Sequence, residues 1–411
     1  MSPSPSVVVT GLGAVSSLGV GVDRQWRAAL AGRASIGPIG LFDTASHRTT
    51  IAAEVPKDAE LAPGRGFSRA ERFACTAAAE AVQGLPPAVL RSPRAGVFFG
   101  SSTGALHEGE RFLAALLQHR EGELAPLAAQ QNDGPGTAVA RMLGVQGPVV
   151  TFSTACTSAN VALAAALDAL QSGEIDVAVA GGADELCEIT YAGFNSLRSV
   201  DARPTLPFRT SRAGLSLGEG AGVLLLETLA HAEQRGAPML CELAGAGRSC
   251  DAHHVSAPDP DGTGAAAAIR MALQQAGLPP DAVTFVNAHG TGTPHNDDAE
   301  SKAMLAVFGA RSARIPVTST KSLVGHLLGA AGGIEAVFTV LSIVHRQLPP
   351  TAGDEPADPA LCLDVVLQQA RALPSQNAGL STNLAFGGNN AVLLFRSLGF
   401  LGSLGFRSLS P

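Results

Sequence analysis

The strongest constraint on the fold is a regular alternation of short β-branched runs with longer stretches rich in Ala and Leu. The short apolar runs predict buried strands, and the longer stretches predict helices. Strands that alternate with helices predict an α/β fold built on a largely parallel sheet. The first predicted strands are 7–10, 95–99, 149–153, 177–180 and 222–226, and the first predicted helices are 69–82, 105–118, 157–171 and 264–276.

The same alternation occurs a second time in the later part of the chain. Its predicted strands are 241–246, 284–288, 316–320, 381–384 and 391–395, and its predicted helices are 298–308 and 328–345. The repetition suggests an internal duplication into residues 1–235 and 236–395. The tail, 396–411, has no strand or long-helix pattern, so we expect a flexible extension. Docking of a partner is the alternative for this tail.

Composition narrows the class of protein. Apolar residues make up 46% of the chain and charged residues 15%, which excludes an intrinsically disordered chain. The formal net charge of −7 argues against a nucleic-acid-binding protein. The six cysteines form no CxxC pair, which indicates free thiols in a reducing compartment. Without a signal peptide or an apolar stretch of 18 residues, we expect a cytoplasmic protein with no membrane span.

A candidate nucleophile, Cys156, lies between a predicted strand and a predicted helix. The strand ends near Ser153, and the helix that begins just after Cys156 ends at Gly173. Unpaired N–H groups and the dipole at a helix start favour a thiolate. A cysteine is also a common small hydrophobic core residue. That alternative suits the other five cysteines: Cys75, Cys187, Cys241, Cys250 and Cys362.

A second candidate, His289, directly follows a predicted strand and opens a loop of Gly and Thr residues. Ligands of α/β proteins bind at the carboxyl ends of strands. Thr291 and Thr293 would present two hydroxyls there, suited to a polar, amide-bearing arm. A histidine in this position is also often structural, so both interpretations stay open.

A third strand-to-helix turn contains Lys321 and His326. Cations are disfavoured near the start of a helix, and a local conflict of this kind often marks a site. Glu335 lies nine residues beyond His326, within the helix, and could pair with Lys321.

A fourth turn, 383–390, interrupts a strand with the sequence AFGGNN. Its backbone N–H groups could form an oxyanion hole, and a plain β-turn is the alternative.

Two cofactor interpretations are weak. Zinc is a rival use of a Cys/His/His set, but the spacings do not match the short ligand pairs of structural zinc sites and no fourth ligand stands out. The opening Gly11-Leu12-Gly13 lacks the third glycine of a dinucleotide-binding loop.

Taken together, these turns resemble the β-ketoacyl-acyl-carrier-protein synthases of the chain-elongating (KAS I/II) type. The resemblance extends from Val7 to about Phe395 and implies a thiolase fold, a duplicated, five-layered α-β-α-β-α sandwich that is usually dimeric. The motifs that carry it are VTGLGAVSSLG at the start, TACTSA around Cys156, VAGGADE at 179–185, LGEGAGVLLLE at 217–227, NAHGTGTPHND around His289, TKSLVGHLLGAAG around His326, and NLAFGGNN near the end.

The resemblance implies a decarboxylative Claisen condensation. Cys156 would accept an acyl group from acyl-carrier protein as a thioester. His289 and His326 would hydrogen-bond the malonyl thioester carbonyl and assist its decarboxylation. The enolate would then attack the Cys156 thioester, in fatty-acid, polyketide or aryl-polyene chain elongation.

The resemblance also implies how substrate is held. Backbone N–H groups of Cys156 and Phe386 would form the oxyanion hole, and Phe386 would gate the thiol. Thr291 and Thr293 would contact the phosphopantetheine arm.

Four charged residues would support the site in this family. Lys321 would order it, together with Glu335, Asp297 and Glu300. No metal or redox cofactor is expected, because loss of carbon dioxide drives the bond formation.

The chain departs from the family pattern in three places. Ala385 stands where the family usually has Gly, and its methyl group is expected to stiffen the loop or restrict φ. The stretch 206–214, LPFRTSRAG, lacks both acidic residues of the pattern Arg-Pro-Phe-Asp-x-x-Arg-Asp-Gly. The short loop 199–205 resembles synthases of aryl-polyene pathways, which often pair with a chain-length-factor-like homologue. A heterodimer is therefore an alternative to a homodimer.

Related classes fit less well. A biosynthetic thiolase needs a second reactive cysteine in the C-terminal half, and the loop 383–390 has none. The initiating (KAS III) synthases have Asn in place of the second histidine, which is His326 here. A non-catalytic chain-length factor normally lacks the cysteine, so Cys156, His289 and His326 together predict an active acyltransferase.

The acyl-carrier partner raises an electrostatic problem, because carrier proteins are acidic and this chain is also acidic. Docking requires a local basic patch. Arg69 and Arg72, on the predicted helix 69–82, are the candidates.

Overall fold

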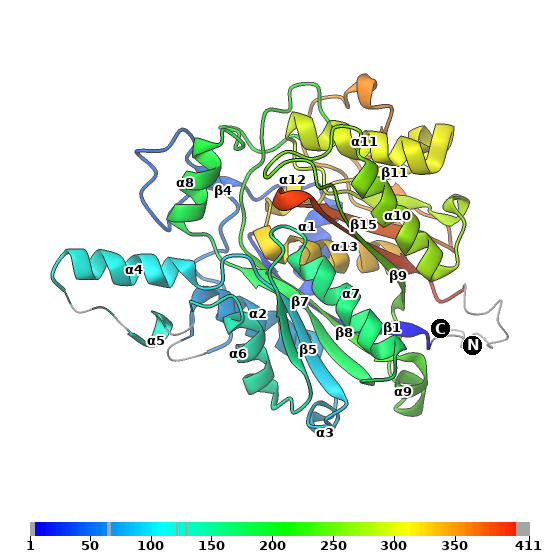
Figure 1. Ribbon diagram of the computed structural model, residues 1–411, viewed down its shortest axis with the longest axis horizontal. Helices are drawn as coiled ribbons and strands as arrows, with labels where there is room; N and C mark the ends of the chain where they lie inside the picture. Colours follow the sequence, from blue (N-terminus) through cyan, green and yellow to red (C-terminus); the bar gives the residue numbers. More distant parts are fainter. Residues whose placement is uncertain (1–4, 64–66, 121, 123, 128–129, 400–411) are drawn as a thin grey trace.

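The computed structural model describes residues 5–63, 67–120, 122, 124–127 and 130–399. Its main feature is a 12-stranded mixed sheet (Figure 1). The strands along its path are β1 (Val7–Ser16), β5 (Ala95–Gly100), β6 (Val149–Phe152), β7 (Val177–Asp184), β8 (Gly220–Thr228), β9 (Cys241–Cys250), β10 (Phe285–Asn287), β11 (Pro316–Thr318), β13 (Asp364–Val365), β15 (Ala378–Leu384) and β16 (Asn389–Arg396). A short strand, β2 (Gly19–Val20), pairs with β1.

The sheet consists of two arms with the same strand pattern. In the first arm β6, β5 and β7 are parallel, and β8 and β1 continue antiparallel. In the second arm β11, β10 and β15 are parallel, and β16 and β9 continue antiparallel. The arms meet where β1 pairs with β9, through Val8 with Glu242 and Val9 with Cys241. The repeated pattern agrees with the expected duplication.

Helices form three layers around these arms (Figure 1). α7 (Ser158–Gln171) and α13 (Ala331–His345) contact each other and strands of both arms, so they form the central layer. α2 (Arg69–Ala81), with α6 (Gly134–Leu143) against it, covers the outer side of the first arm. α10 (Thr263–Ala276), with α11 (Pro294–Phe308) against it, covers the second arm. This five-layered α/β arrangement confirms the predicted fold class.

Small residues let the central helices approach the sheet closely. A Cβ atom added to Gly222 of β8 would lie 2.2 Å from the backbone nitrogen of Ile334 in α13. One added to Gly100 of β5 would lie 2.2 Å from the backbone nitrogen of Ala159 in α7. Neither separation is possible for real atoms, so these glycines set the distance between layers. The scarcity of aromatic residues, 4% of the chain, fits this close packing.

The expectation that the chain contains no apolar stretch of 18 residues needs correction. The segment Leu328–His345, which is the 3₁₀ turn η3 (Leu328–Ala330) followed by α13, is long and apolar enough to cross a membrane by length and composition alone. Its Gly, Ala and Thr residues and the internal Glu335 conceal this in a search for continuous apolar residues. In the structure 89% of the segment is buried inside the protein, as expected for a core helix.

Local sequence explains where the helices begin and end. Ser68 and Glu71 form a reciprocal capping box at the start of α2. Gly144 ends α6 and Gly277 ends α10, each in the left-handed conformation that glycine adopts without strain. The remaining short elements are β3 (Gly37–Pro38), β4 (Ile51–Ala52), β12 (Gln347–Leu348), β14 (Arg371–Ala372), α1 (Val22–Leu30), α3 (Pro87–Leu90), α5 (Leu124–Leu127), α8 (Glu188–Ser196), α9 (Leu229–Gln234) and α12 (Lys321–Val324).

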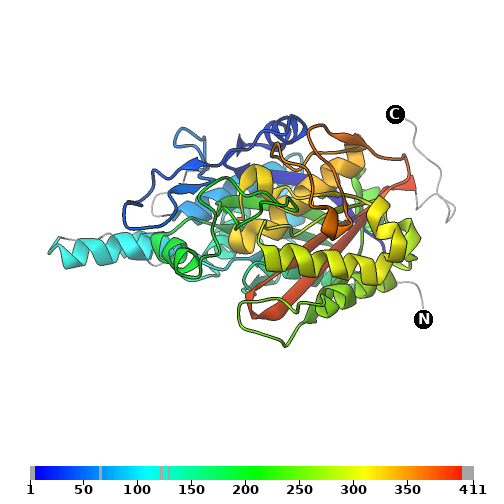
Figure 2. The same ribbon diagram turned by 90° about the horizontal axis from the view of Figure 1, so that it is seen from above.

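One helix, α4 (Leu106–Leu117), extends away from the body of the molecule, as Figures 1 and 2 show. None of its residues is buried. Leu113, Leu116 and Leu117 expose between 51% and 72% of their surfaces. At the other end of the chain β16 includes Arg396, and residues 400–411 of the predicted tail lie outside the described residues.

Candidate active site

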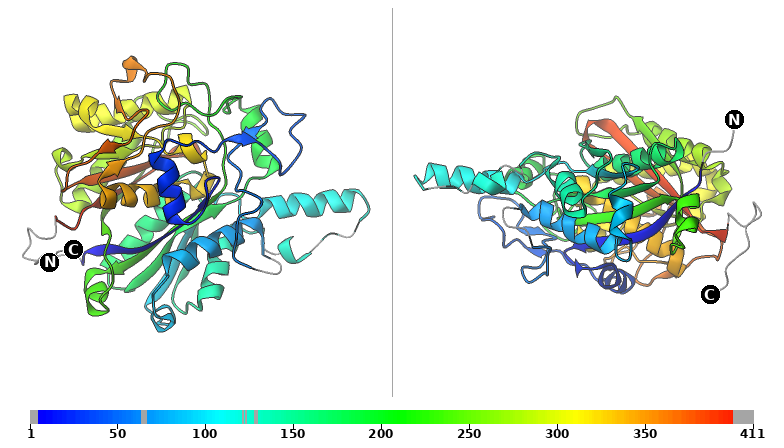
Figure 3. Two further views of the ribbon diagram at one scale, coloured as in Figure 1. Left: turned by 180° about the vertical axis from the view of Figure 1, so that it is seen from behind. Right: turned by 90° about the horizontal axis from the view of Figure 1, so that it is seen from below.

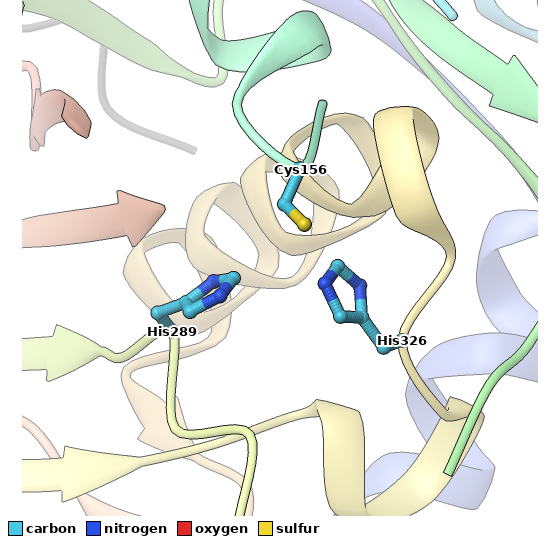
Figure 4. Close-up of side chains that lie close together, drawn as sticks. All are labelled: Cys156, His289 and His326. Carbon is cyan, nitrogen blue, oxygen red and sulfur yellow. The ribbon is translucent and has the colours of Figure 1, made fainter. Parts of the chain in front are cut away.

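Cys156, His289 and His326 meet between the two arms, with their side chains pointing toward one another (Figure 4). A ligand atom from each, the cysteine sulfur and one nitrogen of each ring, lies within 4.8 Å of the other two. All three side chains are buried. They line a cavity of about 310 Å³, and the other candidate residues in its wall are Thr291, Thr293 and Phe386.

The turn that carries Cys156 is strained and held by hydrogen bonds. β6 ends at Phe152 and α7 begins at Ser158. Between them Ala155 has φ +52°, a left-handed conformation that costs a non-glycine residue about 1–3 kcal/mol. The Ser158 hydroxyl donates to the Ala155 carbonyl at 2.6 Å, and the Ser102 hydroxyl donates to the same oxygen at 2.9 Å. These bonds fix the direction of the thiol.

Burial and neighbouring groups have opposite effects on the pKa of the Cys156 thiol. Burial raises the pKa of the thiol to about 11, against the expectation of a thiolate at the helix start. The Lys321 ammonium and the backbone N–H groups of Phe386 and of Cys156 itself lower the pKa but do not overcome the desolvation. These two N–H groups therefore lie near the sulfur, and the oxyanion hole formed by them stays a prediction, since it requires both to point at the thioester oxygen.

Hydrogen bonds from its backbone N–H hold His289 in place. Its N–H donates to Glu300 Oε1 at 2.8 Å and also reaches the Thr382 hydroxyl at 3.0 Å. Its Nδ1 lies 3.5 Å from Nδ2 of Asn383. Burial, with repulsion from Lys321 and His326, holds the pKa of His289 well below its usual value. The ring is therefore neutral at pH 7.

His326 presents a free donor to the cavity. Its Nδ1 accepts the Leu328 N–H at 3.2 Å, so the proton of the neutral ring lies on Nε2. Nε2 is buried and has no hydrogen-bond partner among the described residues. Burial and Lys321 hold the pKa of His326 well below its usual value. The two histidine rings are nearly perpendicular, at 88°, with centroids 5.3 Å apart.

Lys321 and Glu335 form the ion pair that the sequence predicts. Both side chains are 1% exposed, and the ammonium donates to Glu335 Oε1. The second carboxylate oxygen accepts from Asn383 Nδ2. The pair therefore connects α12, α13 and β15 behind the two histidines. Asn383, which sequence reasoning did not single out, links this pair to His289.

Glu300 and Asp297 organise loops and form no hydrogen bond with Lys321. Glu300 accepts the N–H groups of His289 and Gly290, each at 2.8 Å. Asp297 accepts the Phe208 N–H at 2.8 Å and the Gly292 N–H at 3.2 Å, and burial raises its pKa to about 7. The Lys321 charge opposes the burial that raises the pKa of Glu300, so the expected joint role of these carboxylates with Lys321 stays a prediction.

Thr291, Thr293 and Phe386 lie at the wall of the cavity, where the resemblance places substrate contacts. The two threonine hydroxyls are 2.9 Å apart and hydrogen-bonded to each other. The Phe386 ring stacks on Phe194 of α8, with centroids 5.5 Å apart and planes 22° apart. Sequence reasoning missed Phe194, since no local motif marks it.

The departures from the family pattern have local explanations. Ala385 has φ −132° and ψ 156°, an extended conformation that any residue adopts, so its methyl group causes no strain here. In the stretch 206–214, the Arg212 guanidinium pairs with Asp298 at 2.6 Å and with Asp358 at 2.7 Å, carboxylates from outside the stretch.

The electrostatics of the Cys/His/His cluster disfavour a metal ion. Among the described residues no fourth His, Cys, Asp or Glu joins the three ligand atoms. The Lys321 ammonium is close enough to lower the pKa of Cys156 and of both histidines, and its charge repels a cation. The three atoms suit proton transfer and hydrogen bonding instead.

Arg69 does not serve as the free cation expected on α2. Its guanidinium pairs with the fully buried carboxylate of Glu219 and also donates to the Val55 carbonyl at 3.1 Å. The guanidinium also lies 5.1 Å from the centroid of the Phe73 ring. Arg72 donates to the Ala62 carbonyl at 3.4 Å and forms no ion pair within the described residues. Arg69 is structural, and Arg72 is the only one of these two candidates left for docking.

The duplicated arms and the paired central helices are those of the thiolase fold, and the cluster between them defines a condensing enzyme of that fold. Family comparison agrees with this class. Residues 4–232 match the description "Beta-ketoacyl synthase, N-terminal domain", and residues 240–354 match "Beta-ketoacyl synthase, C-terminal domain".

The chain belongs to the β-ketoacyl synthase family and is an acyltransferase of the β-ketoacyl-acyl-carrier-protein synthase class. It is similar to 3-oxoacyl-(acyl-carrier-protein) synthase 2 of Synechocystis sp., with 37% identity over 408 residues, 95% of this chain and 97% of the relative. The protein of the same name from Staphylococcus aureus (strain COL) is 35% identical over 411 residues, 96% of this chain and 99% of the relative.

Solved structures with the same fold include two ketosynthases described together with a chain length factor. The ishigamide ketosynthase/chain length factor has a TM-score of 0.91 and 35% identity, over 96% of this chain and 99% of that chain. The ketosynthase of Xenorhabdus doucetiae in complex with its chain length factor has a TM-score of 0.85 and 31% identity, over 96% and 98% of the two chains.

Proposed function

We propose that Cys156, His289 and His326 perform the two stages of a decarboxylative condensation. The observation that carries the proposal is the convergence of one sulfur and two neutral imidazoles within 4.8 Å, in the wall of a partly open and mainly apolar cavity.

In the first stage the Cys156 sulfur attacks the thioester carbonyl of an acyl-carrier protein. The new bond joins sulfur to the acyl carbon, and the carrier thiol leaves with the proton that the cysteine thiol loses. The N–H groups of Phe386 and Cys156 stabilise the oxyanion. Thr291 and Thr293 contact the phosphopantetheine arm in the cavity wall.

In the second stage the two histidines act on malonyl-acyl-carrier protein. Their Nε2–H groups donate to the thioester carbonyl, the bond to the carboxylate breaks, and its electron pair forms an enolate as carbon dioxide leaves. The enolate carbon attacks the Cys156 thioester, and the cysteine leaves and regains a proton. Neutral rings suit this role, since both pKa values lie well below the usual value.

Intact-protein mass spectrometry tests the nucleophile. Incubation of the wild-type chain with an acyl-carrier protein that bears an acyl group should add one acyl mass. Cys156→Ala should add none, and Cys250→Ala, at an exposed cysteine, should add the same mass as wild type. Undiminished acylation of Cys156→Ala would overturn the assignment.

The proposed acyl-carrier partner docks on a basic patch, with Arg72 as the remaining basic candidate of the pair on α2. Arg72→Glu should raise the KM for carrier protein several-fold and leave kcat unchanged. Arg91→Glu, at an exposed arginine elsewhere on the chain, is the control. Equal KM values would remove Arg72 from the docking face.

We also propose that the chain pairs with a second thiolase-fold chain, either a copy of itself or a chain-length-factor-like homologue. Two features support this proposal. α4 extends from the body with Leu113 and Leu117 exposed, and β6, the last strand of the sheet path, exposes Val149 and Val150 along a free edge. Exposed apolar residues on an edge strand favour pairing with another chain.

Light scattering during size-exclusion chromatography tests this pairing. Leu113→Glu combined with Leu117→Glu should halve the mass of the assembly. Leu305→Glu on α11, where Leu305 is 54% exposed, should not change the mass. An unchanged mass for the double variant would contradict an interface on α4. Co-purification with a tagged homologue distinguishes the heterodimer from the homodimer.

The remaining proposals concern pathway and organisation. The short loop 199–205 and the similarity to ketosynthases described with chain length factors support the aryl-polyene subgroup. Condensation assays with saturated, polyenoic and aryl-polyenoic carriers test it, since preference for saturated chains would contradict it.

We further propose that the chain is divided into residues 1–235 and 236–395, and that it acts in the cytoplasm.

A further inference from the structure

A second cavity lies beside α1, separate from the active site. Its volume is about 410 Å³, and it shares no lining residue with the catalytic cavity. The left view of Figure 3 shows α1 on the face turned toward the reader. The polar groups of its wall are Ser17, Arg24, Arg27, Arg33 and Ser35.

The wall of this cavity is strongly positive. It contains three arginines and no carboxylate. Arg24 and Arg27 are three residues apart on α1 and therefore share a face of the helix, and Arg33 follows the helix. Within the described part of the chain, no carboxylate lies within 4.0 Å of any of the three guanidinium groups. Like charges in one cavity wall repel, and an anion between them relieves the repulsion.

A buried hydroxyl in the same wall also lacks a partner. Ser17 is 4% exposed, and its hydroxyl has no hydrogen bond among the described residues. The Ser17 carbonyl is already used, because the Ser35 hydroxyl donates to it at 2.9 Å. A buried polar group without a partner is destabilising. A ligand oxygen in the cavity would satisfy the Ser17 hydroxyl.

We propose that this cavity binds a phosphate-bearing anion. Guanidinium groups bind phosphate oxygens in bidentate pairs. Three guanidinium groups offer more hydrogen-bond donors than a single carboxylate can accept. The cavity is larger than a single phosphate, and Leu18, Ala28 and Pro56 provide apolar wall for an attached organic group. A soluble phosphorylated compound and a phospholipid headgroup share this chemistry.

Isothermal titration calorimetry with inorganic pyrophosphate, on the full chain at low ionic strength, tests the site. The wild type should bind one equivalent. Arg24→Gln, Arg27→Gln and Arg33→Gln combined should weaken binding at least tenfold. The matched control removes three exposed arginines elsewhere, by Arg91→Gln, Arg141→Gln and Arg314→Gln, and should change binding less than twofold.

Ser17→Ala removes the hydroxyl without a change of charge and should weaken pyrophosphate binding about threefold. No saturable binding by the wild type, or equal losses in the two triple variants, would overturn the proposal. Sedimentation with phosphatidic acid vesicles, against phosphatidylcholine vesicles, identifies the source of the phosphate. Pelleting that depends on the three cavity arginines assigns a lipid headgroup, and its absence beside pyrophosphate binding assigns a soluble ligand.

Discussion

Cys156 and His326 occupy equivalent places in the two arms of the sheet. Cys156 follows β6, the parallel outer neighbour of β5, and precedes the central helix α7. His326 follows β11, the parallel outer neighbour of β10, and precedes the central helix α13. The two turns meet at the middle of the molecule, so one folding pattern places both reacting partners.

The two turns differ in what surrounds them. The turn at Cys156 is short, uncharged and strained at Ala155. The turn at His326 contains an additional helix, α12, whose Lys321 pairs with Glu335 of α13. In the proposed reaction the first arm thus supplies the nucleophile, and the second supplies fixed charge and hydrogen-bond donors. The repeated fold provides two similar positions, and different side chains give them different surroundings.

The largest expected effect is on the free energy of unfolding, when a buried charge is removed from the second arm. Glu335→Ala leaves the Lys321 ammonium buried without its partner, so the free energy of unfolding should fall by about 3–5 kcal/mol. Asn160→Ala, at a buried polar residue of α7, should cost only about 1–3 kcal/mol. Denaturant unfolding of both variants measures the difference, and equal losses would contradict the contrast between the arms.

The next effect separates the two stages of the reaction. His326→Ala should lower condensation at least 100-fold, since general acid–base and hydrogen-bond groups contribute about 10²–10⁴-fold. Acyl loading onto Cys156 should stay within tenfold of wild type. Mass spectrometry reads loading, and release of labelled carbon dioxide reads condensation. If acyl loading and condensation fell by the same factor, His326 would be needed for both stages, and the proposed division of the two stages between the arms would be wrong.

The pH dependence of Cys156 is a smaller, directional effect. Because its pKa is raised to about 11, the thiol is protonated at pH 7 and the thiolate fraction grows about tenfold for each pH unit up to that value. Alkylation of Cys156 by iodoacetamide should therefore rise about tenfold per unit from pH 7 to 10. A rate that levels off below pH 9 would show that the sulfur is less desolvated than its burial implies.

The smallest expected effect concerns strain in the first arm. Ala155→Gly places glycine at φ +52° and should leave the free energy of unfolding unchanged or raise it by up to about 1 kcal/mol. Ala165→Gly, inside α7, should lower it by about 1 kcal/mol. Thermal unfolding compares them. A larger loss for Ala155→Gly than for Ala165→Gly would contradict strain at the turn.

Much of the site was predictable because its residues lie at strand ends marked by local sequence. Cys156, His289 and His326 each follow a predicted strand, and the carboxyl ends of strands gather in one region of an α/β fold. Lys321 and Glu335 were predictable as a pair because both lie in one turn-and-helix segment. The helix bounds were predictable within a few residues for the same local reason.

Contacts between distant segments were not predictable. Glu219 neutralises Arg69 across 150 residues of sequence, so a surface cation was the simpler expectation for Arg69. Asn383 and Phe194 have roles only because tertiary packing places one beside His289 and the other beneath Phe386. The buried state of Cys156, which determines its pKa, likewise depends on the whole fold rather than on the helix start.

The unsatisfied Nε2–H of His326 has a consequence for the evolution of the chain. This buried donor has no partner among the described residues, and in the proposed mechanism a substrate carbonyl accepts from it. Function and robustness are therefore in direct conflict at this atom. The proposed reaction requires the histidine at a position where packing and stability alone favour an apolar residue.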